Sequence, residues 1–499
     1  MTHDDDVLIA GSGFTGLLVA RELLAAGRRV TVIERGGAKS HAEQLADRRH
    51  ELDLLTARHN HEAPRGQEPY PWNYVYGVGG SSLHWTGVAP RLLPSDFRLR
   101  STYGVGRDWP ISYDDLAADY EAAERLLMVA GSPHPDFPSG SPPPQPAHPL
   151  SPVDRLVGEH LAPYHALPQA RLSRPAGGRP ACCGNGFCAL CPVDARQSML
   201  HVLESERMLE HPNFTLVTST AVASLRARGG RVTEIECIDA RRERSQRRAQ
   251  TVVLAANGIE NAALLLRSSL EDRHTGRWLY DHGHRLVHVR IDRSALAGRG
   301  ASHITGLSYA WADGPWRSER GSQLLLTVNQ GALGSRVIVD ALAAGRRGAA
   351  VRAEFRDRAE RLLVFDLVGE DLPAEHRRVE LSSRRDELGL PRSRIVYGAD
   401  SPYLDGARAQ LYRELEDRLR PLGGTVVEVR RAGEGSHQLG TCFMGDGEGV
   451  VDRDLRHHRV ENLFVAGGSA FPSYSAHHPT LTICALALRL GRTLAGGAG

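Results

Sequence analysis

A strand, a glycine-rich turn and a helix occupy the very start of this chain. A short apolar run at residues 7–10 is followed by Gly11-Ser-Gly13-Phe-Thr-Gly16, and then by an amphipathic stretch over residues 17–26. A second apolar run, residues 30–33, ends on Glu34. A Gly-x-Gly-x-x-Gly turn between strand and helix, with an acidic residue about 20 positions on, is typical of a dinucleotide-binding βαβ unit.

The three glycines of this turn have separate physical tasks. Gly11 allows the tight turn, Gly13 lets a pyrophosphate approach the backbone, and Gly16 lets the helix pack closely on the strand. The amides at the helix N-terminus then face the anion, and Glu34 is placed to accept hydrogen bonds from a ribose. The motif therefore predicts a parallel α/β domain that binds a dinucleotide.

Length and charge place the chain among ordinary enzymes. With 499 residues it exceeds one simple core and predicts two domains, which can be interleaved. The net charge of +2 argues against a nucleic-acid partner. Asp4-Asp-Asp6 leads directly into the first strand without a signal peptide, and the apolar run 481–488 is too short to cross a membrane. We expect a cytoplasmic protein; export beside a signal-bearing partner subunit stays open.

The pattern of the chain changes several times along its length. Residues 132–152 are Pro-rich and predict an irregular surface connection. Residues 220–255 predict a strand meander that ends in a buried strand, with a helix following at 260–267. From 284 to 429, strand-like runs at 286–291, 323–328 and 362–367 alternate with polar turns, and one long amphipathic helix at 402–420 closes the region. This favours a largely antiparallel sheet with a covering helix, inserted between parts of the parallel domain.

Two histidines stand in glycine- or proline-punctuated turns near the C-terminus. His437 lies in Ser-His-Gln-Leu-Gly440, and His477-His478-Pro479 opens an apolar helix. Functional side chains are often displayed at such element ends. Proline in the first helical turn leaves neighbouring amides free to meet an anion or a cofactor edge.

Motifs along nearly the whole chain resemble those of the glucose–methanol–choline (GMC) family of FAD-dependent alcohol oxidoreductases. The closest likeness is to bacterial sugar and glycoside dehydrogenases and pyranose oxidases. The motifs are Gly11–Glu34, Gly77-Val-Gly79-Gly80-Ser-Ser82-Leu-His84-Trp85-Thr86, Trp109-Pro110 to Glu124, Leu254 to Asn261, Gly276 to His282, Asp386 to Pro391, and the His437 and His478 segments.

The resemblance implies a fold, a cofactor and a domain division. The fold is α/β, with a Rossmann-like FAD-binding domain interleaved with an antiparallel-sheet substrate domain covered by helices. Residues 1–130, 182–283 and 436–499 form the FAD-binding domain, residues 131–181 are a Pro-rich connection leading to a Cys-rich loop at 182–192, and residues 284–435 form the substrate-binding domain. The residues implied to bind FAD are Gly11, Gly13, Phe14, Thr15, Gly16, Glu34, Arg35, Gly79, Gly80, Ser81, Ser82, His84, Trp85, Thr86, Val222, Ala256, Asn257, Gly468, Pro479 and Thr480. A covalent flavin link at His84 is a further hypothesis, since similar pyranose oxidases carry one.

Alcohol oxidation by hydride loss needs a group that removes the hydroxyl proton, and a neutral imidazole is suited to this near pH 7. His437 matches the base position of the family. His478 matches its second position and would fix the alkoxide oxygen or share the proton. We expect the neighbouring His477 to be structural.

Four of the seven cysteines crowd into one short segment, at Cys182, Cys183, Cys188 and Cys191, with a proline after the last. This spacing resembles iron–sulfur ligation in ferredoxins. Similar clusters in a bacterial branch of the family take electrons from FAD, which implies a three- or four-iron cluster here, with Cys182 or Cys183 among the ligands. A zinc site, disulfides or inert thiols are the alternatives.

The sequence therefore predicts FAD-dependent oxidation of a hydroxyl on a sugar, glycoside or aminosugar, a small polyol-type substrate. Electrons would leave through the cysteine segment to an external acceptor or a partner subunit. Three alternatives remain: an oxidase that uses oxygen and has structural cysteines, a non-redox lyase with FAD as a scaffold, and a purely electron-carrying protein.

Overall fold

The computed structural model describes residues 4–48, 61–66, 70, 72–133, 141–184, 188, 191–295, 304–329, 334–431 and 435–496. Its first sheet contains the predicted βαβ unit, in a parallel array of order β7-β2-β1-β10-β18. The strands are β1 (Asp4–Ala10), β2 (Val30–Ile33), β7 (Phe214–Val217), β10 (Arg244–Leu254) and β18 (Leu463–Val465). Since parallel strands are covered on both faces, they appear in the sequence as continuous apolar runs.

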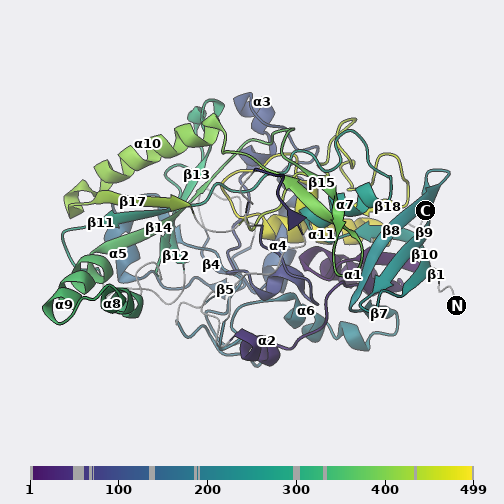
Figure 1. Ribbon diagram of the computed structural model, residues 1–499, viewed down its shortest axis with the longest axis horizontal. Coiled ribbons are helices and arrows are strands. Elements are labelled where there is room, and N and C mark those ends of the chain that lie inside the picture. The colour runs from purple at the N-terminus through teal and green to yellow at the C-terminus, as the bar shows by residue number, and fades with distance from the viewer. Residues whose placement is uncertain are drawn as a thin grey trace.

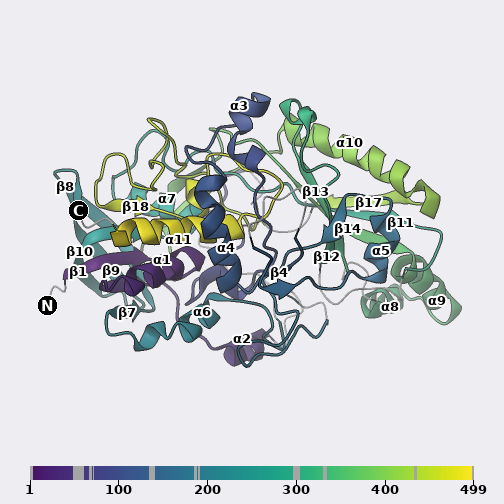
Figure 2. The ribbon, with the colours of Figure 1, turned by 180° about the vertical axis from the view of Figure 1, so that it is seen from behind.

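The same sheet continues as an antiparallel meander. The long strand β10 pairs through its first half with β9 (Arg231–Asp239), and β9 pairs with β8 (Thr220–Arg228), as the sequence predicts. Helices α1 (Phe14–Ala25) and α11 (Thr480–Gly496) lie side by side on one face (Figure 2). They approach so closely that a Cβ on Gly491 would lie 2.6 Å from the Cβ of Glu22. Helix α7 (Gly258–Arg267) packs on β8.

The second sheet is antiparallel throughout, with order β17-β11-β14-β13-β12-β6, and lies at the other end of the long axis (Figure 1). Its strands are β6 (Tyr164–Ala166), β11 (Arg285–Arg290), β12 (Ile304–Ser308), β13 (Gln323–Val328), β14 (Leu362–Gly369) and β17 (Thr425–Arg431). Helix α10 (Pro402–Leu419) covers one face and buries Leu411 and Leu415 against Val287 and Phe365. The predicted fold class is confirmed.

Some elements depart from the sequence expectations. The long helix expected at 402–420 is α10, but the described residues between 284 and 429 also form two shorter α-helices that the sequence analysis did not predict, α8 (Gly334–Ala343) and α9 (Ala349–Phe355). The hairpin β15 (Arg378–Arg385) and β16 (Pro391–Val396) pairs with β3 (His61–Glu62) and packs on α7. Strand β6, from the Pro-rich connection, completes the second sheet. The domain boundaries given above stay a proposal.

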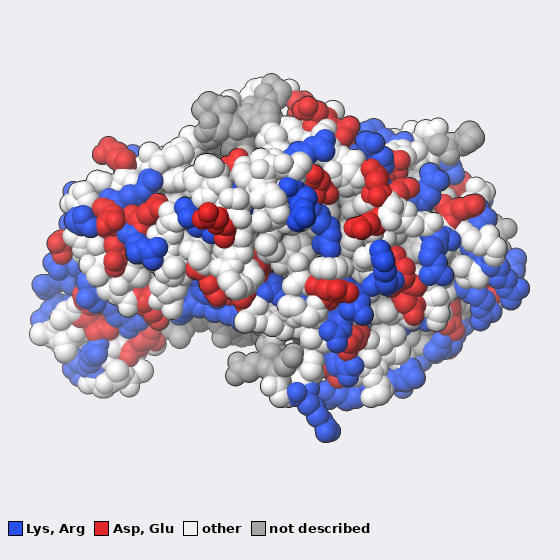
Figure 3. Space-filling view, turned by 90° about the horizontal axis from the view of Figure 1, so that it is seen from above, with Lys and Arg blue, Asp and Glu red and all other residues white. Residues whose placement is uncertain are grey.

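The other helices and strands are short and lie outside the two large sheets. They are α2 (His41–Arg48), α3 (Leu99–Tyr103), α4 (Ala117–Leu126), α5 (Pro152–Gly158), α6 (Met199–Ser205), β4 (Ala130–Gly131) and β5 (Gln145–Pro146). Among the described residues, no helix is long and apolar enough to cross a membrane. On the face drawn in Figure 3, cationic and anionic side chains are interspersed.

A buried ionic cluster joins segments from both ends of the molecule. Nη2 of Arg317 lies 2.9 Å from Asp96 and 3.0 Å from Glu370, and all three side chains are fully buried. Asp96 also accepts a hydrogen bond from Ser475 (2.8 Å), and Glu370 accepts one from the amide of Ser322 (2.7 Å). The cluster thus holds the segment before α11 against the antiparallel sheet.

Replacing Arg317 with methionine leaves two buried carboxylates without their cation. We expect the Arg317→Met variant to lose about 3–5 kcal/mol of unfolding free energy, the typical cost of breaking a buried ion pair. Arg207→Met, which removes a solvent-exposed pair with Glu210, is the control and should change the free energy by about 0–1 kcal/mol. Chemical denaturation measures both, and equal small losses would show that the cluster is not a structural centre.

Candidate active site

A cavity of about 600 Å³ runs between the glycine turn after β1 and the face of the antiparallel sheet. Most residues that the sequence singles out line it: Gly11, Gly13, Phe14, Thr15, Glu34, Arg35, Gly80, Ser81, His84, Trp85, Thr86, Val222, Ala256, Asn257, His437, Gly468, His478, Pro479 and Thr480. Gly16, Gly79, Ser82 and the four clustered cysteines do not line it. Segments far apart in the sequence therefore meet around one space.

The glycine turn is closely packed at Gly11 and Gly16 and open at Gly13. A Cβ on Gly16 would lie 1.9 Å from the carbonyl oxygen of Gly11, so this glycine permits the close contact of helix and strand. Gly11 has φ +108°, and its Cβ would lie 2.6 Å from the oxygen of Ala255. A Cβ on Gly13, in contrast, would meet nothing within 4 Å. Gly13 precedes α1 without a side-chain cap, so the free amides of the helix face the cavity.

The segment around Gly79 supports this turn from the other side. The amide of Gly79 donates to the Ser12 carbonyl (3.1 Å), and Gly79 has φ +97°. Ser82 is buried behind the segment, where its hydroxyl donates to Gly79 and accepts from the amide of Met199. Ser81 lines the cavity, and Ser82 does not.

Glu34 is held entirely by protein donors. Its carboxylate accepts hydrogen bonds from the amide (3.0 Å) and hydroxyl (2.6 Å) of Ser12, the amide of Gly36 (2.9 Å) and the amide of Gly77 (3.0 Å). A carboxylate offers about four acceptor sites. In this structure Glu34 therefore ties three turns together, and its contact with a ribose stays a prediction.

Arg35 lies beside Glu34 and is fixed by two acids and a ring. Its guanidinium pairs with Asp386 (2.7 Å) and Glu387 (2.6 Å) and lies over the ring of Tyr76. The motif at 386–391 thus reaches the dinucleotide end of the cavity from the β15–β16 hairpin. Asn257, at φ +81°, uses its side chain to cap α7, accepting from the amides of Ile259 and Glu260.

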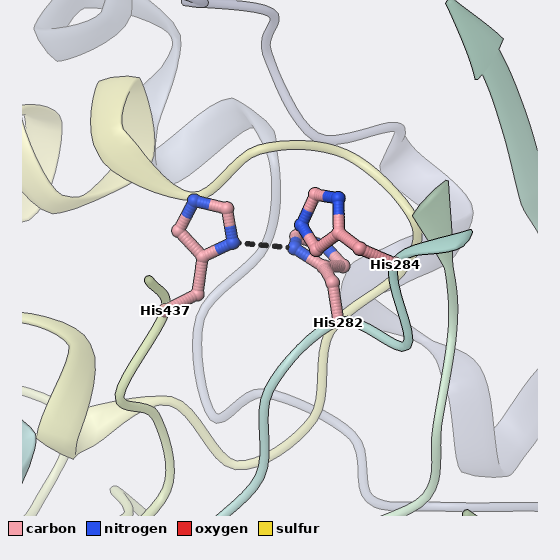
Figure 4. Close-up of side chains that lie close together, drawn as sticks. All are labelled: His282, His284 and His437. Atoms are coloured by element: carbon pink, nitrogen blue, oxygen red, sulfur yellow. Dashed lines mark hydrogen bonds between the residues drawn. The ribbon is translucent and has the colours of Figure 1, made fainter. Parts of the chain in front are cut away.

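Four histidines gather at the opposite end of the cavity (Figure 4 shows three of them). Nδ1 of His437 lies 2.6 Å from Nδ1 of His282, and Nε2 of His282 lies 3.0 Å from the carbonyl oxygen of Ser475. The ring centroids of His437 and His478 are 5.2 Å apart. The sequence marked His437 and His478, whereas His282 appeared only within a family motif and His284 was missed.

These contacts fix the tautomers of two rings. A carbonyl oxygen can only accept, so Nε2 of His282 carries its proton and a neutral His282 has a bare Nδ1. Nδ1 of His437 must then be the donor in the short contact, which leaves the lone pair of His437 on Nε2. In Figure 4 this nitrogen is turned away from His282. The backbone amide of His437 donates to Asp281 (3.1 Å), which further fixes the ring.

Electrostatics make His284 the histidine of this cluster that takes up a proton most readily. Burial would lower the pKa of His284, but the Asp366 carboxylate, 3.1 Å from its Nδ1, outweighs burial and raises the pKa. The pKa of His437 is lowered well below its ordinary value by burial, and further by His478 and His284. Burial and His284 lower the pKa of His478 to about 3. At neutral pH His437 and His478 are therefore uncharged, and His284 is the ring of the three that protonates most readily.

The donor atoms of His282, His284 and His437 all lie within 4.8 Å of one another, a spacing compatible with a metal site. The 2.6 Å between the two Nδ1 atoms argues for a shared proton instead. Two nitrogens bound tetrahedrally to one zinc ion at about 2.0–2.1 Å would lie roughly 3.4 Å apart.

The cysteine segment contacts the site through its neighbours. Cys188 and Cys191 are buried, Cys182 is half-buried and Cys183 is exposed, while residues 185–187 and 189–190 lie outside the described part of the chain. The buried guanidinium of Arg171 donates to Sγ of Cys188 (2.7 Å).

A second arginine connects the segment to residues 83–85. The amide of Arg196 donates to Sγ of Cys191 (3.3 Å), and its side chain donates to the carbonyls of Leu83 (2.9 Å) and Trp85 (2.6 Å). The indole of Trp85 donates to the carbonyl of Gln197 (2.8 Å). Cys191 and the cavity wall at Trp85 are therefore joined through one residue.

Comparisons with known proteins identify the family of the chain. Sequence models of the N- and C-terminal parts of the GMC oxidoreductase family match residues 166–284 and 373–487. The chain is 30% identical to the fructose dehydrogenase large subunit of Gluconobacter japonicus, over 98% of this chain and 97% of that protein. It is 32% identical to the 6'''-hydroxyparomomycin C oxidase of Streptomyces lividus, over 98% and 91%. It is 31% identical to the paromamine 6'-oxidase of Streptomyces fradiae, over 99% and 93%.

The fold also has solved counterparts. The crystal structure of pyridoxine 4-oxidase from Mesorbium loti superposes with a TM-score of 0.64 at 21% identity, covering 98% of this chain and 99% of that one. At this identity the likeness concerns the fold.

Two glycine variants distinguish an effect on dinucleotide binding from an effect on folding. We expect Gly13→Val to fold but to lose bound dinucleotide, because its side chain enters open space in the cavity. Gly16→Val should fail to fold, because its side chain would collide with the backbone of Gly11. Circular dichroism and the flavin absorbance of the purified protein measure the two effects. A Gly13→Val protein that retains its full flavin content would contradict this position for the pyrophosphate.

Proposed function

This chain belongs to the GMC oxidoreductase family, and from that premise we propose that it is an FAD-dependent dehydrogenase that oxidises a hydroxyl of a sugar, glycoside or aminosugar. The observation that carries the proposal is the position of a neutral histidine, His437, in the cavity that also contains the glycine turn at Gly11–Gly16. A dinucleotide and an alcohol can then meet in one space.

The residues present suit FAD. The pyrophosphate and flavin would lie in the open space at Gly13, against the free amides at the start of α1 and against Ser81. Pro479 and Thr480, at the start of the 17-residue helix α11, also line the cavity, so the amides of that helix can stabilise negative charge on the ring. When bound, FAD supplies the hydride acceptor. A covalent link at His84, which is buried in the wall, remains a hypothesis.

His437 would act as the general base. Its Nε2 has the lone pair, its Nδ1–H is engaged by His282, and its lowered pKa keeps it unprotonated through the neutral range. His437 accepts the hydroxyl proton at Nε2 as the hydride leaves the neighbouring carbon. His478, with Nδ1 buried and no hydrogen-bond partner among the described residues, would hold the substrate oxygen.

The substrate class follows from the relatives. Fructose dehydrogenase, paromamine 6'-oxidase and 6'''-hydroxyparomomycin C oxidase are named for a sugar and two aminoglycosides, and each aligns with nearly the whole chain. We extend that class, hydroxylated rings with or without amino groups, to this protein. A name that includes "large subunit" also supports an external electron acceptor or a partner subunit. We retain a cytoplasmic location, or export beside such a partner, within this proposal.

The central test is flavin reduction without oxygen across monosaccharides, glycosides and aminoglycosides. At neutral pH we expect His437→Gln to bind FAD normally and to be reduced about 10²–10⁴-fold more slowly, the usual contribution of a positioned base. Because the pKa of His437 is lowered, protonation of this base should not slow the wild-type enzyme in the neutral range and should slow it in acid.

His274→Gln is the matched control, because His274 lies outside the cavity against Phe443. It should be reduced at the wild-type rate. A His437→Gln enzyme that is reduced normally would remove His437 from this role. Failure of every alcohol to reduce the wild-type flavin would favour the lyase or the electron-carrier alternative.

We further propose that electrons leave through an iron–sulfur cluster held by Cys188, Cys191 and one or both of Cys182 and Cys183. The buried Arg171 guanidinium donates to Sγ of Cys188 and would offset the negative charge of an iron–sulfur cluster bound there. Arg196 connects Cys191 with the backbone at Trp85, which gives a short covalent and hydrogen-bonded route from the cavity wall. The number of irons and the choice between Cys182 and Cys183 are for experiment.

Iron and acid-labile sulfide should be present in the purified enzyme in at least three equivalents per flavin. Cys188→Ser should lose both, retain FAD and still be reduced by substrate, but pass electrons slowly to a one-electron acceptor. The Cys237→Ser variant, which changes a buried cysteine outside the segment, should contain as much iron as the wild type. Hydrogen peroxide release in air from an enzyme without iron would favour the oxidase alternative.

A further inference from the structure

A largely buried carboxylate, Asp366 of β14, lies on the face of the antiparallel sheet that lines the cavity. In β14, Leu363, Phe365 and Leu367 face the core beneath α10. On the opposite face, Val368 packs in a second apolar cluster together with Leu324 and Leu326 of β13. Because side chains alternate along a strand, Asp366 shares this second face, directly beside Leu326 in the register. The same face also carries His288 of β11, which pairs with Glu428 of β17, but the residues directly opposite Asp366 are Leu326 and Leu286.

Asp366 is paired with His284, which precedes β11. Both carboxylate oxygens lie near Nδ1 of His284, at 3.1 and 3.3 Å, and each side chain is largely buried. Both residues line the cavity. The other acidic residues in its described wall, Glu34 and Glu260, lie near Arg35 at the dinucleotide end.

Stability alone does not account for such a pair. A buried ion pair costs desolvation that its attraction barely repays, and well-packed apolar residues in its place are often neutral or stabilising. An all-apolar sheet face would serve the fold at least as well here. A buried pair of titratable groups that opens into a cavity is a candidate for binding a ligand.

The pair stands beside the two histidines that the proposed reaction uses. The ring centroid of His284 is 5.8 Å from that of His437 and 5.9 Å from that of His478. With one hydroxyl bound at Nε2 of His437, a second hydroxyl on the neighbouring carbon atom can reach His284 and Asp366. A hydroxyl both donates and accepts, which matches a carboxylate acceptor next to an imidazolium donor.

We propose that the His284–Asp366 pair is a recognition site for the hydroxyl adjacent to the one oxidised, so that the enzyme selects vicinal diols. The inference rests on the proposed function and narrows it to substrates with two neighbouring hydroxyls on a ring. Because the pair is neutral overall, an uncharged sugar satisfies it, and no substrate amine is required.

Cyclohexanol and trans-cyclohexane-1,2-diol test this directly, because they differ only in the adjacent hydroxyl. Stopped-flow flavin reduction gives the efficiency, kred/Kd, for each. We expect the wild type to prefer the diol, and Asp366→Asn and His284→Gln to lower the diol-to-cyclohexanol ratio about ten- to a hundredfold, the worth of a hydrogen bond to a charged group. Calorimetric titration of the reduced enzyme, which cannot oxidise the ligand, should show the same loss of diol affinity.

Asp400→Asn is the matched control. Asp400 is a half-buried acid of the same unit, paired with Arg285 and Arg408 and outside the cavity wall, so its loss should leave the ratio unchanged. If Asp366→Asn does not fold, the double variant His284→Leu/Asp366→Leu replaces the pair with apolar groups and should fold with the same loss of diol preference.

The outcomes separate the two proposals. A wild-type flavin that no alcohol reduces contradicts the proposed function. A wild type that is reduced, with a ratio that Asp366→Asn and His284→Gln leave unchanged, contradicts only the recognition role. A double variant that also fails to fold would make the pair structural and overturn the inference.

Discussion

The reactive end of the cavity depends on the buried ion pairs of Arg317. Its guanidinium is shared between Asp96, from the N-terminal part of the chain, and Glu370, at the end of the β14 region. Asp96 in turn binds the hydroxyl of Ser475, and the carbonyl of Ser475 accepts the proton of His282. Buried charged groups must stay paired, because each unpaired group would carry its full desolvation penalty. The cluster therefore fixes the segment that carries Ser475 and His478 relative to the sheet that carries His284.

From that fixed carbonyl, a chain of hydrogen bonds determines where a proton can be accepted. Ser475 sets the tautomer of His282, and His282 sets that of His437. Four imidazoles in one buried space cannot all be charged, and the carboxylate of Asp366 raises the pKa of His284 while burial lowers the pKa values of the other three. The result is that His437 and His478 are uncharged beside the ring that protonates most readily. That is a suitable environment for a base that accepts a proton from a substrate whose oxygen develops negative charge.

The cavity divides its tasks between two kinds of structure. The dinucleotide end is made of backbone: glycines without side chains, free amides at the start of α1, and turns tied together by Glu34. The reactive end is made of side chains from three distant segments, held by buried polar contacts. The cysteine segment lies behind the wall between them and contacts it through Arg196.

The sequence determined what depends on neighbours in the chain. The glycine turn, the apolar runs of β1, β2, β13 and β14, the meander of β8–β10 and the long helix α10 follow from local spacing and alternation. His437 and His478 followed from motif resemblance, and their places in one cavity agree with it. The helices α8 and α9 were missed because they are only 10 and 7 residues long and lie in a region of strand-like runs.

Only the tertiary structure decided what depends on meetings across long stretches of chain. The bond between His282 and His437 joins residues 155 positions apart, and the pair of His284 with Asp366 joins residues 82 apart. Neither leaves a pattern in the sequence, since a histidine after a turn or an aspartate within an apolar run has no partner until the sheets form. Burial then sets their charges, and burial is a property of the packed molecule, not of the order of its residues.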